Sequence, residues 1–226
     1  MSKQYRYDDR AELDLALTEA ITTQLNKGIA TRGTASLVVS GGSTPKGLFQ
    51  TLSSSELDWT KVTVLLADER WVPETHADSN SAIVKSLLLQ GAAAAAKWID
   101  FGAGRDDADI EVARVAEILS AMGTFDVVIL GMGTDSHTAS LFPCSIELPE
   151  GLSTTDPVLM THPTTAPHRR LSLSKFRLLK TELGIIHLIG KSKLEVYKKA
   201  TARDDDDMHP ISHFAHHEQF SLWFAP

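Results

Sequence analysis

The sequence predicts an α/β fold in which helices flank a doubly wound, mostly parallel sheet. Four short apolar runs, SLVVS, VTVLLA, FDVVIL and GIIHLIG, lie near turn residues, as is typical of strands buried on both faces. Segments with helical spacing of apolar residues alternate with these runs. Because ligands of such sheets bind beyond the carboxyl ends of the strands, we expect the functional residues in the loops that follow the strands.

The first helix is expected to begin at about Asp9, because leucine, isoleucine and alanine recur there every three or four residues, and Gly28 is expected to end it. The alanine-rich stretch 91–97 is short and is interpreted as the ragged end of a helix. Further helices are predicted at about 45–53, about 79–90 and about 109–122.

Composition is that of an ordinary globular protein. The chain has 226 residues, of which 42% are hydrophobic and 23% charged, and no repeat or long linker divides it, so we expect a single domain over residues 1–226. The net charge of -7 argues against nucleic-acid binding. One cysteine, Cys144, excludes an internal disulfide and fits a reducing compartment. No apolar run indicates a signal peptide or a membrane span, so a cytoplasmic location is expected.

The sequence SGGSTP follows the first predicted strand and precedes a helical pattern. Pro45 suits the first helical position and Thr44 suits the N-cap before it. Gly41 and Gly42 can adopt positive φ and allow a ligand close to the backbone, whose N–H groups favour an anion at a helix start. Two interpretations stay open, a capped turn and a phosphate cradle, and no nucleotide-binding motif is present.

The second strand runs directly into DERWVP, where Asp68, Glu69 and Arg70 stand at its carboxyl end. Such residues can bind sugar hydroxyls, a phosphate or a catalytic histidine. A surface turn with a local Asp–Arg pair is the alternative.

The third strand is followed by GMGTDSHTASLFP, which contains His137. A neutral imidazole can take a proton from water near neutral pH, and a carboxylate can fix its tautomer. Asp135 or Asp68 could supply that carboxylate. His137 is therefore the candidate general base.

Later segments add cations and weaker candidates. Arg169 and Arg170 precede a strand pattern, APHRRLSLS, and one of them could hold a phosphate through its planar fork of donors. Lys191, in GKSK, could add a further cation or simply precede a surface helix. The histidines of HFAHH lack matching acidic or cysteine ligands, so no metal site is predicted, and Cys144 receives no role. The acidic run 204–207 is interpreted as a solvated connection.

Taken together, SGGSTP, ADERWVP, DSN, GMGTDSHTASLFP, APHRRLSL and GKSK resemble the 6-phosphogluconolactonase family over approximately residues 10–200, and HTASLFP is the most specific segment. The resemblance implies a modified Rossmann-like domain, shared with glucosamine-6-phosphate deaminases and ribose-5-phosphate isomerases. It also implies hydrolysis of 6-phospho-D-glucono-1,5-lactone without a metal or organic cofactor. The expected partner is this small sugar-phosphate lactone, with no nucleic acid or membrane, and the protein is expected to be a monomer or small homo-oligomer.

The resemblance also implies roles for individual residues. His137 would activate water, Asp68 would orient the sugar or His137, and Arg70 with backbone N–H groups would stabilise charge on the lactone oxygens. The residues expected to bind the substrate or its phosphate are Gly41, Gly42, Ser43, Thr44, Asp135, Arg169, Arg170 and Lys191.

Two positions depart from the family pattern GMGPDGHTASLFP, with Thr134 in place of proline and Ser136 in place of glycine. If the glycine position needs positive φ, serine is strained there by about 1 kcal/mol or more.

Two alternative functions remain open. One is an amino-sugar phosphate deaminase or isomerase, whose histidine segment usually continues as HIAFNEP. The other is a non-catalytic sugar-phosphate sensor.

Overall fold

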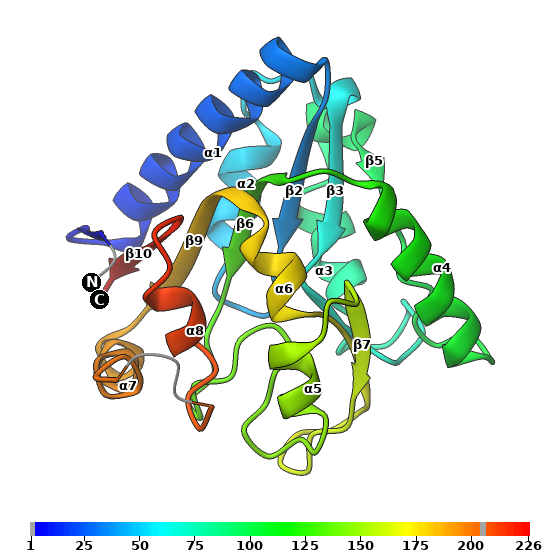
Figure 1. Cartoon of the computed structure of the whole chain (residues 1–226). Coiled ribbons are helices and arrows are strands. Elements are labelled where there is room, and N and C mark those ends of the chain that lie inside the picture. Colours follow the sequence, from blue (N-terminus) through cyan, green and yellow to red (C-terminus); the bar gives the residue numbers. More distant parts are fainter. Residues whose placement is uncertain (1–2, 204–206) are drawn as a thin grey trace.

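The computed structural model describes residues 3–203 and 207–226, and its centre is a parallel sheet (Figure 1). Within the described residues seven strands pair in parallel. In spatial order they are β1 (Gln4–Arg6), β10 (Phe220–Ala225), β9 (Thr181–Ile189), β6 (Phe125–Leu130), β2 (Ala35–Val39), β3 (Val62–Leu66) and β5 (Lys97–Trp98).

The strand order reverses between β2 and β6. From β2 the chain moves to β3 and β5 on one side, and from β6 it moves to β9 and β10 on the other. Such a reversal leaves a crevice at the carboxyl ends of the two central strands, where ligands of doubly wound sheets bind. The predicted fold class is confirmed, and its geometry places the loops after β2 and β6 side by side.

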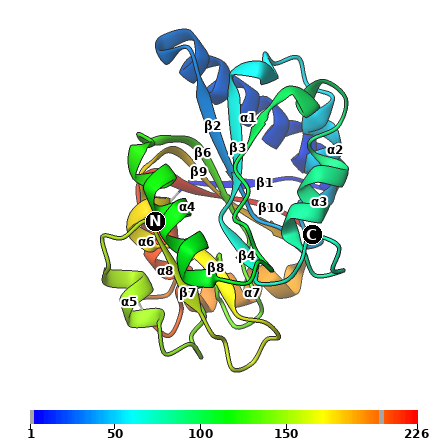
Figure 2. The same ribbon diagram turned by 90° about the vertical axis from the view of Figure 1, so that its right-hand side faces the viewer.

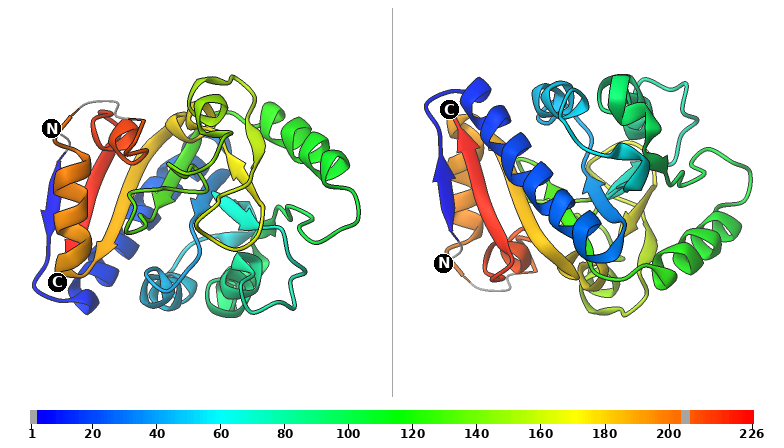
Figure 3. Two further views of the ribbon diagram at one scale, coloured as in Figure 1. Left: turned by 90° about the horizontal axis from the view of Figure 1, so that it is seen from below. Right: turned by 90° about the horizontal axis from the view of Figure 1, so that it is seen from above.

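Helices cover both faces of the sheet, as Figure 3 shows for α1 and α7 on opposite sides of β9 and β10. The α1 helix packs across β2, β6 and β10 and alongside α2, while α7 packs on β9. Leu13, Leu17, Ile21 and Leu25 of α1 are fully buried in this core. The helices are α1 (Arg10–Arg32), α2 (Lys46–Ser53), α3 (Asn80–Leu87), α4 (Ala108–Ala121), α5 (Leu148–Ser153), α6 (Lys175–Leu179), α7 (Lys191–Ala200) and α8 (Ser212–Ala215), with 3-10 turns η1 (Trp59–Lys61) and η2 (Gly91–Ala95).

A small antiparallel sheet continues from the main one. Its strands are, in order, β4 (Asp68–Arg70), β8 (Arg170–Leu173) and β7 (Val158–Thr161). The chain passes from β3 to β4 through Ala67, whose carbonyl accepts the N–H of Leu173 at 2.9 Å. Figure 2 shows β4 below β3, next to β7 and β8. The second predicted loop is therefore itself a strand, which fixes the directions of its side chains.

Three sequence-based boundaries were wrong. The first helix does not end at Gly28 but continues to Arg32, and Gly33 caps it with φ +79°. Gly28 instead faces the buried carboxylate of Asp126, where an added Cβ would lie 2.2 Å from an oxygen. The stretch 91–97 forms η2 and then β5 instead of a helix end, and the helix predicted at 79–90 stops at Leu87.

Several strands were not predicted. β1 and β10 form one edge of the main sheet, and β7 belongs to the small sheet. The acidic run 204–207 lies largely outside the described residues, so its interpretation as a solvated connection stays a prediction. No helix in the described part of the chain combines the length and apolar character needed to cross a membrane.

Candidate functional site

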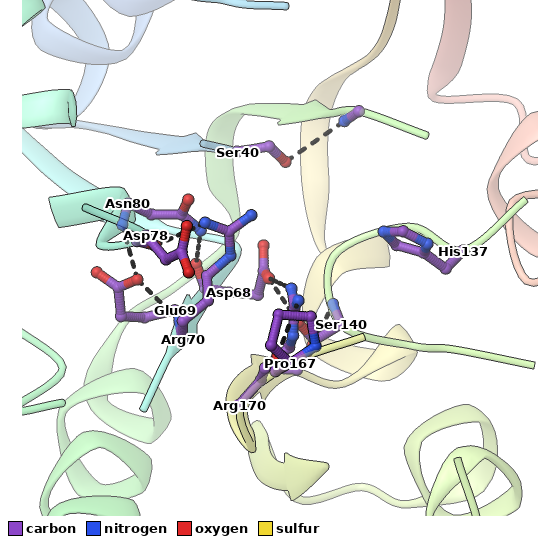
Figure 4. Close-up of polar contacts among 12 residues, drawn as sticks. Ser40, Asp68, Glu69, Arg70, Asp78, Asn80, His137, Ser140, Pro167 and Arg170 are labelled. Atoms are coloured by element: carbon purple, nitrogen blue, oxygen red, sulfur yellow. Dashed lines mark hydrogen bonds and ion pairs between the residues drawn. The ribbon is translucent and has the colours of Figure 1, made fainter. Parts of the chain in front are cut away.

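A cavity of about 260 Å³ opens at the carboxyl ends of β2 and β6. Loops from both halves of the sheet line it, together with β4, β8 and β9 (Figure 4). The sequence-predicted residues that line it are Gly41, Gly42, Ser43, Thr44, Asp68, Arg70, His137 and Arg170. Lining residues that the sequence analysis did not propose include Ser40, Asn80, Met132, Gly133, His187 and Lys193.

In the loop after β2, two glycines allow neighbouring groups to lie close to the backbone. Gly42 has φ +85°, a conformation that favours glycine. A Cβ on Gly41 would lie 2.0 Å from the side-chain oxygen of Asn80, so only glycine fits there. Arg10 holds the loop from outside through bonds to the carbonyls of Ser43 (3.3 Å) and Thr44 (2.7 Å). These bonds anchor the backbone of the loop, whose residues 41–44 line the cavity.

The expected N-cap at Thr44 was wrong. Pro45 occupies the cap position of α2, with φ -83° and ψ 2°, and no side chain caps the helix. The hydroxyls of Ser43 and Thr44 are therefore not used to cap α2. Both residues line the cavity at the amino end of an eight-residue helix, where N–H groups and the helix dipole favour an anion.

The strand geometry of β4 separates the residues of DERWVP into two groups. Side chains of a strand alternate between its faces, so Asp68 and Arg70 share the cavity side and Glu69 points the other way. Glu69 is 1% exposed and accepts the N–H groups of Asn80 (2.8 Å) and Ser81 (2.7 Å) at the start of α3. Burial raises the pKa of Glu69, although these backbone hydrogen bonds oppose the rise. Glu69 thus positions α3 and does not reach the cavity.

Asp68 is held by two neighbours at the cavity wall. Its carboxylate accepts the hydroxyl of Ser140 at 2.5 Å and lies 3.9 Å from a guanidinium nitrogen of Arg170. Burial lowers the pKa of Arg170, and the charge of Asp68 opposes that change. The side chain of Arg170 also lies 4.9 Å from the ring centre of Phe142. Asp68 and Arg170 form a buried charged pair that lines the cavity.

Arg70 and Asn80 stand next to the glycine loop. Arg70 donates to the carbonyl of Asp78 at 2.6 Å. The side-chain nitrogen of Asn80 donates to the carbonyl of Asp68 at 2.9 Å, while its buried oxygen has no hydrogen-bond partner among the described residues. An unpaired buried acceptor at a cavity wall is costly unless a ligand donates to it. The DSN motif signalled this residue, but its role was not assigned from the sequence.

His137 and Asp135 form a hydrogen-bonded pair after β6. The Nδ1 atom of His137 lies 2.5 Å from the Asp135 carboxylate, so Nε2 is the nitrogen that remains for a ligand. Burial alone would raise the pKa of Asp135, but the bond to His137 and its charge lower it. The imidazole stacks on Phe142 with ring centres 3.8 Å apart. A Cβ on Gly133 would lie 2.2 Å from the ring, so this glycine makes room for it.

Of the two places that the sequence analysis offered for Asp135, the structure shows the contact with His137. Asp135 was predicted among the substrate-binding residues, yet it does not line the cavity and binds His137. Of the two carboxylates considered as partners for His137, Asp135 makes the contact, whereas Asp68 binds Ser140 and lies beside Arg170.

Ser136 adopts the conformation that its glycine-like position implied. Its φ is +65°, and its side chain is buried beside the candidate base. The Ser136 hydroxyl bonds the carbonyl of Asp135 and lies 2.7 Å from Nδ1 of His209. The N–H of Ile211 also donates to the Ser136 carbonyl at 3.2 Å. The serine therefore ties the His137 loop to the segment before α8.

Only some of the positively charged side chains in the predicted segments line the cavity. Arg170 lines the cavity, whereas Arg169 lies over Trp71 with its guanidinium 5.4 Å from the ring centre. Lys191 is an exposed first residue of α7 and does not line the cavity. Lys193 does, and its amine donates to the carbonyl of Met132 at 2.8 Å. Burial lowers the pKa of Lys193. GKSK signalled a cation here, but the helix turns its second lysine inward.

His187 on β9 forms part of the cavity wall. Burial lowers its pKa to about 3, with smaller contributions from the charges of Arg10 and Lys193, so the ring is neutral. Neither ring nitrogen has a hydrogen-bond partner among the described residues. Because His187 lies within the apolar strand pattern GIIHLIG, the sequence did not distinguish it from a core residue.

The residues set aside in the sequence analysis lie elsewhere. Cys144 lies 3.1 Å from the hydroxyl of Thr165. In HFAHH, His213 bonds the carboxylate of Asp207 and His216 bonds the carbonyl of Thr201. Neither segment contributes to the cavity lining.

Comparison with known proteins places the chain among sugar-phosphate enzymes. A family model described as glucosamine-6-phosphate isomerases/6-phosphogluconolactonase matches residues 8–223. A 6-phosphogluconolactonase of Pseudomonas putida is 37% identical over 99% of this chain and 93% of its own length. One from Rhizobium meliloti is 40% identical over 91% and 90%, respectively. The crystal structure of a 6-phosphogluconolactonase from Shewanella baltica superposes with a TM-score of 0.95 and 41% identity, over 100% of this chain and 98% of that one.

Proposed function

The chain belongs to the glucosamine-6-phosphate isomerase/6-phosphogluconolactonase family, and from this premise we propose how it hydrolyses 6-phospho-D-glucono-1,5-lactone to 6-phosphogluconate. The observation that carries the proposal is the Asp135–His137 pair at the wall of a cavity that also holds an anion-binding loop. The pair supplies a general base, and the loop supplies a binding site for the phosphate. Both are needed for a phosphorylated lactone.

The 6-phosphate binds at the loop from Gly41 to Thr44. Ser43, Thr44 and Pro45 line the cavity at the amino end of α2, where free N–H groups favour an anion, and Lys193 lines the same cavity. Arg170 adds a guanidinium, which can bind a phosphate with two parallel hydrogen bonds. This arrangement supports the roles proposed for the loop and for Arg170, and it favours Lys193 over Lys191 as the lysine that contacts the ligand.

The reaction begins with a water molecule at Nε2 of His137. The imidazole accepts a proton from this water as its oxygen forms a bond to the lactone carbonyl carbon, and Asp135 stabilises the imidazolium. The carbonyl electrons move onto oxygen, where Arg70 and backbone N–H groups offset the negative charge. Collapse of this intermediate breaks the bond between the carbonyl carbon and the ring oxygen. The ring oxygen takes the proton from His137, which restores the neutral base.

Asp68 and Asn80 orient the sugar. The carboxylate of Asp68 can accept a hydroxyl, and the unpaired oxygen of Asn80 can accept another. The buried partners of Asp68 fix its direction before the substrate arrives, which limits the entropy lost on binding.

The experiment is a coupled assay on freshly generated 6-phosphogluconolactone, corrected for spontaneous hydrolysis. We expect His137→Ala to lower kcat by about 10²- to 10⁴-fold, since that is the usual contribution of a positioned general base. The matched control is His162→Ala, because His162 also pairs with a carboxylate, that of Glu147, outside the cavity. Equal corrected rates for the wild type and His137→Ala would rule out the proposed base.

Binding of 6-phosphogluconate to the same proteins separates catalysis from recognition. We expect His137→Ala to keep its affinity for this product, because the phosphate loop is unchanged. A wild type that binds 6-phosphogluconate tightly without turning over the lactone would be a sensor, the role that the replacement of glycine by Ser136 had left open. Turnover of an amino-sugar phosphate in place of the lactone would favour the deaminase alternative.

We also propose that the protein works in the cytoplasm as a monomer or small homo-oligomer and binds no nucleic acid. The single cysteine supports the cytoplasmic location, and the net charge of -7 argues against nucleic-acid binding.

A further inference from the structure

Three potential metal ligands meet beside the cavity but outside its lining. His76 and Asp78 belong to the segment between β4 and α3, and His168 lies just before β8. One ligand atom from each lies within 4.8 Å of the other two, the single such group found in the described part of the chain. None of the three lines the cavity, so the proposed hydrolysis leaves this cluster without a role.

The contacts within the cluster converge on the Asp78 carboxylate. One of its oxygens lies 3.0 Å from Nε2 of His168 and 3.9 Å from Nδ1 of His76. The two rings lie edge to face with centres 5.2 Å apart. Two imidazoles and one carboxylate therefore face a common point from two separate loops.

We propose that His76, Asp78 and His168 bind a divalent transition-metal ion of the Zn²⁺ class. Imidazole nitrogen with one carboxylate suits Zn²⁺, Co²⁺ or Ni²⁺, whereas Mg²⁺ and Ca²⁺ prefer oxygen ligands alone. Three protein ligands leave the remaining position to water.

The ligand atoms need only a small rearrangement. Zn–N and Zn–O bonds of about 2.1 Å in a tetrahedron place ligand atoms roughly 3.4 Å apart. Since the three ligand atoms all lie within 4.8 Å of one another, no separation must shorten by more than about 1.4 Å. The side chains are 26–50% exposed and can rotate to do so. The ion replaces the hydrogen bond that Nδ1 of His76 accepts from the N–H of Asp78 at 3.1 Å.

The site is linked to the cavity through the backbone of Asp78. The carbonyl of this residue accepts the hydrogen bond from Arg70, which lines the cavity. A bound ion joins this segment to the loop before β8, and so fixes the partner of Arg70. We assign the ion a positioning role, and it contributes no step to the hydrolysis.

The test is calorimetric titration of the tag-free full chain with Zn²⁺, after removal of metal by a chelator. We expect one Zn²⁺ per chain in the wild type, affinity at least about tenfold lower in His168→Asn and in His76→Gln, and no binding of Mg²⁺. Asparagine is chosen at 168 because the residue has φ +68°, which asparagine tolerates. Thermal melting of each variant verifies folding, and His76→Gln keeps the test valid if His168→Asn is unstable.

Two controls separate this site from other histidines. His162→Gln removes an exposed histidine bound to Glu147, and His217→Gln alters HFAHH, so both are expected to bind Zn²⁺ as the wild type does. Co²⁺ should give the strong visible absorption of a low-coordinate site in the wild type and lose it in His168→Asn. Unchanged Zn²⁺ affinity in His168→Asn and His76→Gln, or loss of binding in His217→Gln, would overturn the proposal.

Discussion

The proposed base, His137, has neighbours that fix it from several directions. Asp135 binds one ring nitrogen, Phe142 stacks on its face, and the absence of a side chain at Gly133 leaves it room. A catalytic group held in one orientation loses little entropy on the way to the transition state. The orientation of the proposed base therefore depends on residues outside the proposed reaction steps, and Asp135 and Phe142 do not line the cavity.

Ser136 allows backbone strain and hydrogen bonding to be measured separately. Ser136→Ala keeps a Cβ at φ +65° but loses the contact with His209, whereas Ser136→Gly loses the contact and relieves the backbone. We expect the alanine variant to be less stable than the glycine variant by about 1 kcal/mol or more. Denaturant unfolding of the three proteins measures this difference. If both variants lose equal stability, the backbone at this position is not strained.

Individual site residues could be predicted from the sequence where a chemically suitable side chain stands directly after a predicted strand. His137 and Asp68 could be selected because a charged or imidazole side chain follows an apolar strand. The sequence offered both Asp135 and Asp68 as the carboxylate partner of His137, and only the folded structure decides for Asp135. Nothing in the sequence indicated Ser140 as the partner of Asp68. Glu69 carries the same charge as Asp68 but faces α3, a difference that depends on strand alternation in β4.

At the scale of an element, α7 shows how helical geometry chooses between two nearby lysines. Lys191 and Lys193 are two residues apart and therefore lie on different sides of the helix, and Lys193 reaches the carbonyl of Met132. GKSK indicated a cation at the site. Which lysine faces inward depends on the position at which the helix begins.

The two lysines form a matched pair for experiment. We expect Lys193→Met to raise KM by about ten- to hundredfold with a smaller effect on kcat, because a charged hydrogen bond to the phosphate is lost. Lys191→Met should leave KM unchanged, since Lys191 is exposed and outside the cavity. Steady-state kinetics on the lactone measure both. If KM rises in Lys191→Met but not in Lys193→Met, the phosphate contact is to be assigned to Lys191 instead.

At the scale of the whole molecule, the fold class followed from the alternation of apolar runs and helical patterns. The edge strands did not, because β1 has three exposed residues and β5 has only two residues in all. These strands are defined by their partners, Phe220–Ala225 and Val62–Leu66, and not by their own composition. Alternation in sequence thus predicts the centre of such a sheet better than its borders.

Acid should destabilise the molecule in part through Glu147. Burial alone would raise the pKa of this carboxyl, but hydrogen bonds from Ser145 and His162 lower it from 4.5 to about 2. A lowered pKa means that the ionised carboxylate stabilises the fold above pH 4.5 and that this contribution disappears as pH falls toward 2.

We therefore expect Glu147→Gln to be less stable than the wild type at neutral pH and to approach it as pH falls below 4.5. Denaturant midpoints of the two proteins between neutral and acid pH measure this convergence. Asp156→Asn serves as the control, because Asp156 is an exposed carboxyl and no side-chain hydrogen bond to it is found among the described residues. A constant difference between Glu147→Gln and the wild type across the range would contradict the assignment.

The alternation of side chains along β4 has a consequence for anyone who surveys variants of this protein. A substitution at Glu69 releases the start of α3, and with it Asn80, although the carboxylate never reaches the ligand space. An activity screen would rank Glu69 together with Asp68 and Arg70. Only a stability measurement made on the same variants would separate the residue that supports the start of α3 from the two that line the cavity.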